Sequence, residues 1–371
     1  MYSSMVELKS KKIMFVNGDS DVGGAGKMMK YVVNATSASF ASASLVEIYS
    51  DIIRSGISEN VKVFPLGVRL QGIFKFRFNA ILKIRKIIKC EKPDIVLTFV
   101  NHEALLTLLA TIGLPTIVCS AEREDPFSNK FPWNILYRLL FKFSDFGFFQ
   151  LPLAKKFYYK KSQKGFIIPN VFIPNKHFKR YEGVRKKTIV AAGRFVPDKG
   201  FDILIKSFEK VHSLYPDYKL IIYGNGPCLE KCQLLAADLG LNDYIFFPGY
   251  VKDLAETIKE DGMFVLSSFF EGIPNSLIEA LSTGIPCIST DCTPGGPRYL
   301  SKNGENILLV PTKDKDAIAK AIIYLIENPA IANKLSLSGP EILLDLTDEK
   351  IKNQWLSAFK HIINMRYEKT K

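Results

Sequence analysis

Two glutamates with a helix start between them form the most informative motif in the sequence. Glu271 and Glu279 are separated by seven residues, and Asn275 or Ser276 is placed to cap the helix that contains Glu279. Free N–H groups at a helix start attract anions. The motif therefore suits sugar hydroxyls at the loop carboxylate, ribose hydroxyls at the helix carboxylate and a phosphate between them. A solvated loop acid beside an ordinary helix acid is the plainer interpretation.

Cations and glycine turns follow expected strands in the same half of the chain. Gly193 and Arg194 end one strand, and Lys199 comes five residues after Arg194, before a helix. An arginine fork and a lysine point charge can together hold a pyrophosphate, although solvated surface charge is an alternative. Residues 224–227 and 247–250 form two more glycine turns after strands, and each is a weak signal alone.

Another glycine loop, residues 18–26, follows the first expected strand and opens a helix. It suits a phosphate, but Met28 and Met29 stand where a Walker A loop needs Ser or Thr and a dinucleotide fingerprint needs its third glycine. Asp19 and Asp21 imitate the D-x-D of metal-dependent sugar transferases. We interpret them as turn residues and expect no metal ion and no cofactor. A tight turn without a ligand is the alternative for this loop.

Charge is distributed unevenly along the chain. The net charge is +13; residues 1–186 hold 29 Lys and Arg against 14 Asp and Glu, whereas residues 187–371 hold 21 against 23. The first half, at +15, therefore calls for an anionic partner: nucleic acid, anionic lipid or a phosphorylated substrate. Nucleic acid is disfavoured because no helix-turn-helix, RRM or zinc signature is present. Charge that merely aids solubility is the remaining alternative.

Basic and aromatic residues are interleaved in two stretches of the basic half, residues 68–92 and 153–164. Such stretches suit the surface of an anionic membrane. The alternative is a domain helix with a buried apolar face and a solvated basic back. The sequence contains no apolar run of about 18 residues that would span a bilayer, and residues 1–17 do not have the pattern of a secretory signal. We expect a cytoplasmic protein with peripheral membrane contact.

The six cysteines include no C-x-x-C pair, and the four histidines are not at zinc-finger spacing. We therefore expect free thiols in a reducing compartment.

Strand-like apolar runs alternate with helical patterns through both halves, which predicts parallel sheets built from βαβ units. The expected strands are residues 13–17, 61–64, 95–99, 116–119, 146–150, 188–192, 219–223, 245–248, 263–267, 286–289 and 307–310. We predict an α/β protein of two doubly wound, Rossmann-like domains that face a cleft. The domains are residues 1–170 and 188–345, joined by a linker at 171–187, and a final helix in 346–371 crosses back.

Together these motifs resemble the family-four retaining glycosyltransferases of the GT-B fold. The resemblance covers nearly the whole chain and is densest over residues 193–311. Residues 23–26 look like the family's first glycine turn, residues 193–200 like its G-R-x-x-x-x-K-G, and residues 271–279 like its Glu, seven residues, Glu motif.

The resemblance implies roles for individual residues. Arg194 and Lys199 would neutralise the donor's diphosphate, Glu271 would touch the donor sugar, and Glu279 would bind the ribose. Donor contacts are also implied for the following residues: Gly24, Gly193, Gly226, Tyr250, Val251, Gly272, Ile273, Pro274, Asn275, Ser276 and Leu277. The family is retaining and metal-independent. The implied partners are a nucleoside-diphosphate sugar, by family UDP-linked, and a glycan or polyprenyl-diphosphate-linked acceptor of bacterial surface polysaccharide.

One segment departs from the common family pattern. Many members have a histidine after the strand that corresponds to residues 116–119, whereas this chain has Glu122 and Arg123, which we assign to the acceptor side. A sugar-nucleotide epimerase or phosphorylase of the same fold is an alternative. A nicotinamide oxidoreductase is disfavoured because neither glycine turn completes the dinucleotide fingerprint.

Overall fold

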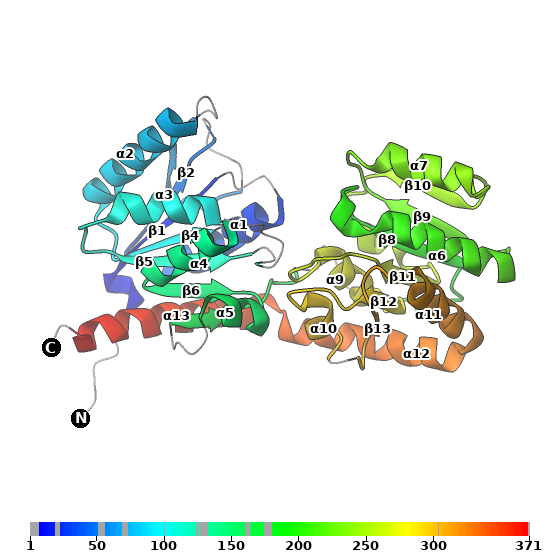
Figure 1. Cartoon of the computed structure of the whole chain (residues 1–371). Coiled ribbons are helices and arrows are strands. Elements are labelled where there is room, and N and C mark those ends of the chain that lie inside the picture. Colours follow the sequence, from blue (N-terminus) through cyan, green and yellow to red (C-terminus); the bar gives the residue numbers. More distant parts are fainter. Residues whose placement is uncertain are drawn as a thin grey trace. The chain divides into compact units, whose positions relative to one another are not determined.

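The computed structural model describes residues 7–18, 23–50, 56–68, 73–99, 101–123, 126, 133–159, 164–173, 180–302 and 304–369. The chain divides into two compact units (Figure 1). Unit 1 comprises Met1–Val171 and Asp348–Lys371, and unit 2 comprises Phe172–Thr347. Both units have the Rossmann-like α/β architecture that the strand–helix alternation predicts.

Unit 1 contains a seven-stranded sheet in the order β3-β2-β1-β4-β5-β6-β7. All of its pairings are parallel, and helices cover both faces, as is usual for parallel sheets. The strands are β1 (Lys12–Asn17), β2 (Ser42–Glu47), β3 (Val61–Pro65), β4 (Ile95–Phe99), β5 (Ile117–Glu122), β6 (Phe146–Phe149) and β7 (Gly165–Ile167).

The helices of unit 1 include the C-terminal segment of the chain. They are α1 (Gly23–Thr36), α2 (Ile73–Glu91), α3 (Asn101–Thr111), α4 (Trp133–Phe143), α5 (Pro152–Tyr158) and α13 (Asp348–Lys369). Trp355 and Phe359 of α13 are fully buried in the core that α1 forms with one sheet face, while α2 and α3 bury Ile84 and Leu106 against the other. Trp355 stacks on Phe148 at 4.6 Å between ring centroids. The final helix thus returns to unit 1, as expected.

Unit 2 contains a six-stranded parallel sheet in the order β10-β9-β8-β11-β12-β13. The strands are β8 (Thr188–Ala192), β9 (Lys219–Tyr223), β10 (Ile245–Gly249), β11 (Met263–Leu266), β12 (Cys287–Thr290) and β13 (Leu308–Val310). The strand order changes direction between β8 and β11. Ligands of such sheets bind at this switch point, beyond the carboxyl ends of the strands.

The helices of unit 2 are α6 (Phe201–Leu214), α7 (Leu229–Asp238), α8 (Leu254–Ile258), α9 (Asn275–Ser282), α10 (Gly296–Leu300), α11 (Lys315–Glu327) and α12 (Pro329–Ser338). Short 3₁₀ segments are η1 (Leu8–Ser10), η2 (Ser37–Ser39), η3 (Pro197–Lys199) and η4 (Gly339–Asp345). Helices α6 and α11 share the main core of the unit.

No helix in the described ranges is long and apolar enough to cross a bilayer. The six cysteines are free thiols.

Two strands are absent from the sequence prediction: β2 and β7. Strand β2 has the sequence SASLVE, whose serines and alanine have little strand propensity; it is a buried strand because β1 and β3 pair with both of its edges.

Candidate functional site

The loop after β11 carries Glu271 to the switch point of the unit 2 sheet. The Glu271 carboxylate accepts hydrogen bonds at Oε1 from Lys199 Nζ and, at 2.7 Å, from Ser268 Oγ. Its backbone N–H donates to the carbonyl of Thr293 at 2.9 Å. The carboxylate is therefore held by a cation, a hydroxyl and the neighbouring loop. Its side chain is only 12% exposed.

Lys199 ends the short 3₁₀ segment η3 that follows β8. Ser267 Oγ donates to the Lys199 carbonyl at 2.8 Å, and the N–H of Phe269 donates to the carbonyl of Asp198 at 2.7 Å. The next residue, Gly200, has φ 62°, and a Cβ there would lie 2.4 Å from the carbonyl oxygen of Ser267. The loops after β8 and β11 thus fit only with glycine at position 200, and together they fix the Lys199–Glu271 pair.

Arg194 is the second cation after β8. Its side chain is exposed, and within the described residues it makes no hydrogen bond or ion pair to a side chain or carbonyl. Arg194 and Lys199 therefore place one uncommitted and one paired positive charge at the carboxyl end of the same strand. A diphosphate requires this kind of charge.

The turns after β8, β9 and β10 pack backbone against backbone. Gly193 N–H donates to the Tyr223 carbonyl at 3.0 Å, and Gly224 N–H donates to the Gly249 carbonyl at 2.8 Å. A Cβ at Gly224 would lie 1.9 Å from the carbonyl oxygen of Gly193, so no other residue fits there. Gly226 belongs to the same turn. After β10, Tyr250 is 68% exposed and Val251 is half-buried beside it.

Helix α9 begins without a side-chain cap. The sequence predicts Asn275 or Ser276 as the cap, which is wrong: Pro274 occupies the capping position and Asn275 is the first helical residue. The first intrahelical hydrogen bonds start from the N–H groups of Leu277 and Ile278. Because no side chain caps the helix start, its first amides stay available to a ligand.

The remaining predicted donor residues surround this helix start. Gly272 lies in the preceding loop, Ile273 is buried, and Glu279 is half-buried within α9. A Cβ at Gly296 would lie 1.5 Å from the carbonyl oxygen of Gly272, so the loop after β12 presses directly against the Glu271 loop. The structure brings all the predicted residues of unit 2 to one edge of one sheet.

The predicted residues of unit 1 have different surroundings. Gly24 lies in the first turn of α1, and Glu122, at the end of β5, accepts a hydrogen bond from Tyr158 Oη at 2.6 Å. Arg123 is 8% exposed and donates to the Ile168 carbonyl at 3.0 Å. Its guanidinium lies 5.3 Å from the ring centroid of Trp355. Burial lowers the pKa of Arg123, and the Glu122 carboxylate partly offsets this effect. Its Nε and Nη2 atoms are buried and have no hydrogen-bond partner among the described residues, so Arg123 remains a proposed acceptor-side residue.

Sequence reasoning missed two buried carboxylates at the carboxyl edge of the unit 1 sheet. Glu47 ends β2 and is fully buried. Glu103 lies in the first turn of α3, and a Cβ at Gly18 would approach its Oε1 to 2.6 Å. Glu103 therefore lies beside the end of β1, at the switch point of this sheet. The available signal was its place directly after the expected strand at 95–99.

No group of three or more His, Cys, Asp and Glu side chains in the described part of the chain is arranged to hold a metal ion. Asp19 and Asp21, the alternative metal ligands, lie outside the described residues.

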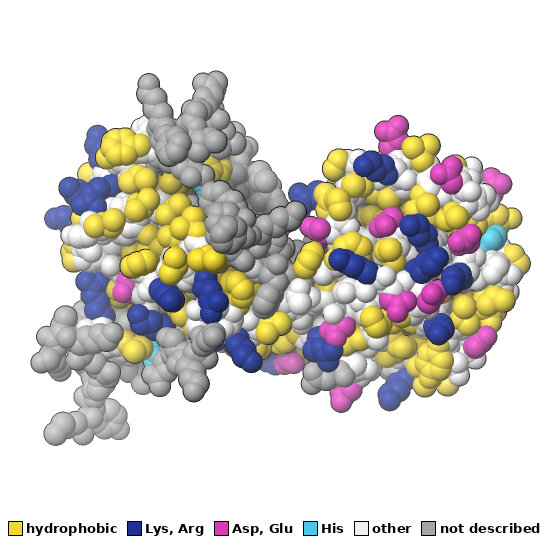
Figure 2. Space-filling view, viewed as in Figure 1, with side chains coloured by type: hydrophobic (Ala, Val, Ile, Leu, Met, Phe, Trp, Pro, Cys, Tyr) yellow, Lys and Arg dark blue, Asp and Glu magenta, His cyan; other side chains and the backbone are white. Residues whose placement is uncertain are grey.

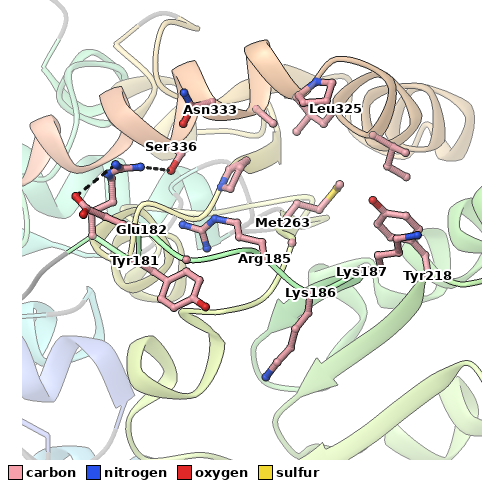
Figure 3. A pocket seen from close by; sticks show the side chains of 17 residues that line it. Tyr181, Glu182, Arg185, Lys186, Lys187, Tyr218, Met263, Leu325, Asn333 and Ser336 are labelled. Carbon is pink, nitrogen blue, oxygen red and sulfur yellow. Dashed lines mark hydrogen bonds and ion pairs between the residues drawn. The ribbon is translucent and has the colours of Figure 1, made fainter.

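A hollow of about 560 Å³ lies at the opposite, amino-terminal edge of the unit 2 sheet (Figure 3). It is lined by cations that already have partners. Arg180 pairs with Glu182 at 3.6 Å, and Lys187 pairs with Asp217. The positive charge of this hollow is thus largely balanced from within the unit.

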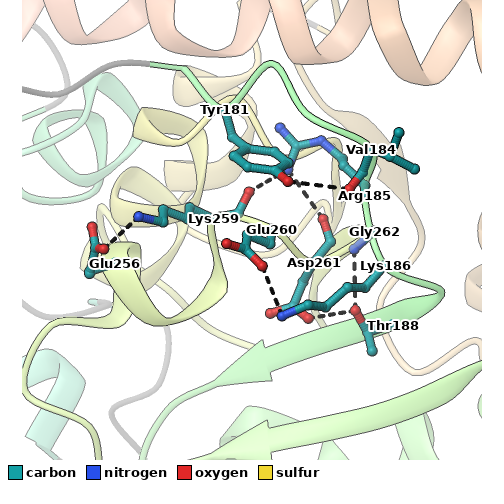
Figure 4. Close-up of polar contacts among 10 residues, drawn as sticks. All are labelled: Tyr181, Val184, Arg185, Lys186, Thr188, Glu256, Lys259, Glu260, Asp261 and Gly262. Carbon is teal, nitrogen blue, oxygen red and sulfur yellow. Dashed lines mark hydrogen bonds and ion pairs between the residues drawn. The ribbon is translucent and has the colours of Figure 1, made fainter.

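Arg185 connects this hollow to the turns that precede two strands of the sheet (Figure 4). Its guanidinium donates to the carbonyls of Lys259 at 2.7 Å and Gly284 at 2.8 Å, in the turns that precede β11 and β12. Burial lowers the pKa of Arg185. Beside it, Lys186 pairs with Glu260 at 3.0 Å. These contacts fasten the segment before β8 to the base of the sheet, and we place no substrate there.

Comparison with known proteins agrees with this geometry. The family model for glycosyl transferases group 1 matches residues 172–341, which is most of unit 2. An uncharacterized glycosyltransferase of Methanocaldococcus jannaschii is 30% identical over 332 residues, covering 74% of this chain and 80% of that protein. The chain is a group 1 glycosyltransferase. This confirms the resemblance that the motifs carry.

Two further comparisons extend this likeness over nearly the whole chain. An N-acetyl-D-galactosaminyltransferase of Campylobacter jejuni, named for an acceptor built on PP-undecaprenol, is 24% identical over 363 residues and covers 95% of this chain and 99% of itself. The solved structure of HepE from Anabaena in complex with UDP has a TM-score of 0.77 and 16% identity, covering 94% of this chain and all of that one. The second likeness establishes the fold alone.

Proposed function

We propose that this glycosyltransferase moves a hexose or N-acetylhexosamine from a UDP-sugar to a lipid-linked glycan acceptor, with retention of configuration, in bacterial surface polysaccharide synthesis. The observation that carries the proposal is the Lys199–Glu271 pair at the switch point of unit 2, inside the region that the family model matches. The complex of HepE with UDP and the acceptor in the name of the Campylobacter relative support UDP and the lipid-linked acceptor.

The residues at the switch point bind different parts of the donor. Arg194 and Lys199 bind the diphosphate, and the uncapped amides at the start of α9 bind phosphate or sugar oxygens. Glu279 of α9 binds the ribose hydroxyls. Glu271 binds hydroxyls of the donor sugar, with Ser268 as its second hydrogen-bond partner.

The reaction exchanges one bond at the anomeric carbon for another. The bond from this carbon to the diphosphate oxygen breaks while the acceptor oxygen attacks from the same face. The acceptor's proton passes to the departing diphosphate. The negative charge that develops on the diphosphate strengthens its interaction with Arg194 and Lys199, which lowers the barrier. This requires that, when the donor binds and before the bond breaks, Lys199 exchanges its contact with Glu271 for the diphosphate and Glu271 turns to the sugar.

The acceptor side belongs to unit 1, where we keep Glu122 and Arg123 as proposed contacts. Gly24, also in unit 1, stays a proposed contact of the donor through its backbone amide. A lipid-linked acceptor places the enzyme at the cytoplasmic face of a membrane as a peripheral protein, with an anionic lipid surface as partner.

The test is transfer from a panel of nucleotide sugars to polyprenyl-diphosphate-linked sugars, followed by mass spectrometry of the products. Transfer from a UDP-sugar with an α-linked product supports the proposal. A β-linked product from the same α-linked donor contradicts retention. Transfer from GDP-sugars alone contradicts the assignment of UDP. Thermal-shift screening with UDP, GDP, NAD and oligonucleotides separates donor binding from the oxidoreductase and nucleic-acid alternatives.

A further inference from the structure

Helix α4 of unit 1 exposes a stripe of large apolar side chains. Ile135, Leu139 and Phe143 are 51%, 45% and 75% exposed. They are spaced four residues apart, so they lie along one face of the helix, which turns once every 3.6 residues. A helix that packs on a sheet normally buries its apolar stripe. Helix α4 buries Phe141 in the unit and still presents this second stripe outward.

Neighbouring helices extend the apolar surface. Helix α2 packs against α3, α3 against α4, and α4 against α5. Leu82 of α2, Leu109 and Ile112 at the end of α3, and Leu153 of α5 are also exposed. Figure 2 shows the resulting band of hydrophobic side chains across this face of unit 1, with Lys and Arg at its borders. Contiguous exposed apolar surface of this kind marks an interaction site.

The charges on the helices of the band are mostly positive, although Asp145, two residues after the end of α4, is exposed. The sequences of α4 and α5 contain no Asp or Glu, and α2 has only Glu91, its last residue. Lys86 and Lys89 of α2, Lys142 of α4 and Lys156 of α5 are exposed. None of these four lysines forms an ion pair with a carboxylate in the described part of the chain. Arg85 is excluded from this set because it donates to the carbonyls of Ala110 and Ile112.

An apolar band bordered by unpaired cations is complementary to one kind of surface. The headgroups of an anionic bilayer supply the negative charge, and the acyl boundary beneath them accepts exposed leucine, isoleucine and phenylalanine side chains. A protein partner would have to match both features with an acidic rim around an apolar centre. The acidic residues of this chain's own second half are instead interspersed with cations in ion pairs, so a second copy does not supply such a surface.

We infer that the outer face of α3, α4 and α5, centred on Ile135, Leu139 and Phe143, is a docking surface for anionic lipid bilayers. The inference deepens the proposed function, since it names the surface through which the enzyme meets a lipid-linked acceptor. It places the apolar contact on α4, a helix that the basic–aromatic stretches of the sequence do not include. Lys142 and Lys156 flank the stripe and contact the lipid phosphates.

The experiment is co-sedimentation with vesicles of phosphatidylcholine alone or with one-third phosphatidylglycerol, in low salt and without donor or acceptor. The test variant carries Ile135→Gln, Leu139→Gln and Phe143→Gln. The control carries Leu234→Gln, Leu337→Gln and Leu344→Gln, three exposed leucines of unit 2. We expect the wild type and the control to sediment with anionic vesicles, and the α4 variant to lose at least five-fold in bound fraction.

A second variant, Lys142→Glu with Lys156→Glu, keeps the apolar stripe and reverses two charges. We expect it to lose binding to anionic vesicles at low salt, where screening is weakest. An unchanged circular dichroism spectrum and an unchanged urea midpoint by tryptophan fluorescence, which reports on unit 1, verify that each variant is folded.

Equal binding of the wild type to neutral and anionic vesicles, or binding to neither, overturns the inference. So does an α4 variant that binds as the wild type does, or a wild-type dimer that the α4 substitutions dissociate. Because the vesicle assay needs no sugar transfer, its failure leaves the proposed reaction intact. Failure of transfer with intact vesicle binding contradicts the reaction alone.

Discussion

The two sheets share a strand order and differ in what stands at the switch point. In unit 1 the order changes direction between β1 and β4, and in unit 2 between β8 and β11. Unit 2 places Arg194, Lys199 and the uncapped start of α9 at this edge. Unit 1 places the buried carboxylates of Glu47 and Glu103 there. Topology therefore locates a site in each unit, and the residues decide its ligand.

The net charge of each unit does not predict the charge of the side chains at its switch point. Unit 1 is formed mostly from the basic half of the sequence, yet the carboxyl edge of its sheet carries buried carboxylates. Unit 2 is formed from the nearly neutral half, yet the switch point of its sheet carries cations. Buried carboxylates disfavour an anion and suit hydroxyl or amine donors. We therefore assign the diphosphate to unit 2 and interpret the excess charge of unit 1 as belonging to its outer surface.

The largest effect is expected where backbone contacts shape the unit 2 edge. Gly296→Ala places a Cβ 1.5 Å from the Gly272 carbonyl oxygen and must displace the Glu271 loop. A shift of about 1 Å in a catalytic loop costs on the order of 100-fold in kcat/KM. The matched control is Gly295→Ala, where a Cβ meets nothing within 4 Å and only the positive φ is strained. Comparable losses in both variants would contradict the role of this contact.

The next largest loss of activity is expected at the carboxyl edge of the unit 2 sheet, and its control lies at the amino edge of the same sheet. Glu271→Gln removes the charge that pairs with Lys199 and is expected to lower kcat/KM by roughly 30-fold, which is about 2 kcal/mol of transition-state stabilisation, with an unchanged unfolding temperature. Glu260→Gln, which removes the partner of Lys186 at the amino edge, should stay within about threefold of wild type. Steady-state kinetics on both variants checks this. Activity of Glu271→Gln within threefold of wild type would show that the site lies elsewhere.

An arginine in each unit sharpens the comparison. Arg123→Ala empties a buried position between Phe99 and Trp355 and should lower the free energy of unfolding by about 2–4 kcal/mol. Arg194→Ala removes an exposed side chain and should change it by less than about 0.5 kcal/mol. Both tryptophans of the chain belong to unit 1, so urea unfolding followed by tryptophan fluorescence reports the first effect. An unchanged midpoint for Arg123→Ala would show that the packing of this side chain does not stabilise unit 1.

The smallest effect is expected from metal removal. Lys199 and Arg194 supply the positive charge that a divalent ion would otherwise supply, so EDTA should leave transfer unchanged. Full inactivation by EDTA, with recovery on adding Mg²⁺ or Mn²⁺, would instead favour Asp19 and Asp21 as metal ligands.

The sequence predicts those parts of the fold in which local pattern and tertiary role agree. Strands β8 and β9 are predicted to the residue because their apolar runs are buried and bounded by turns. Strand β2 is missed because its burial depends on pairing with β1 and β3. The motif spacing identifies Glu271 and Lys199, but no spacing shows that they pair. The burial of Arg123 could not be predicted, because it depends on Trp355 in a helix more than 200 residues away.

The most direct test of the account is calorimetric titration of UDP into the wild type, Lys199→Ala and Lys186→Ala. A lost charge-assisted contact to phosphate costs about 1.5–3 kcal/mol, or roughly ten- to 150-fold in Kd. The account predicts this loss for Lys199→Ala and near wild-type affinity for Lys186→Ala, which lies at the opposite edge of the same sheet. Equal affinity of wild type and Lys199→Ala, or a loss confined to Lys186→Ala, would contradict the claim that the switch point of unit 2 holds the donor diphosphate.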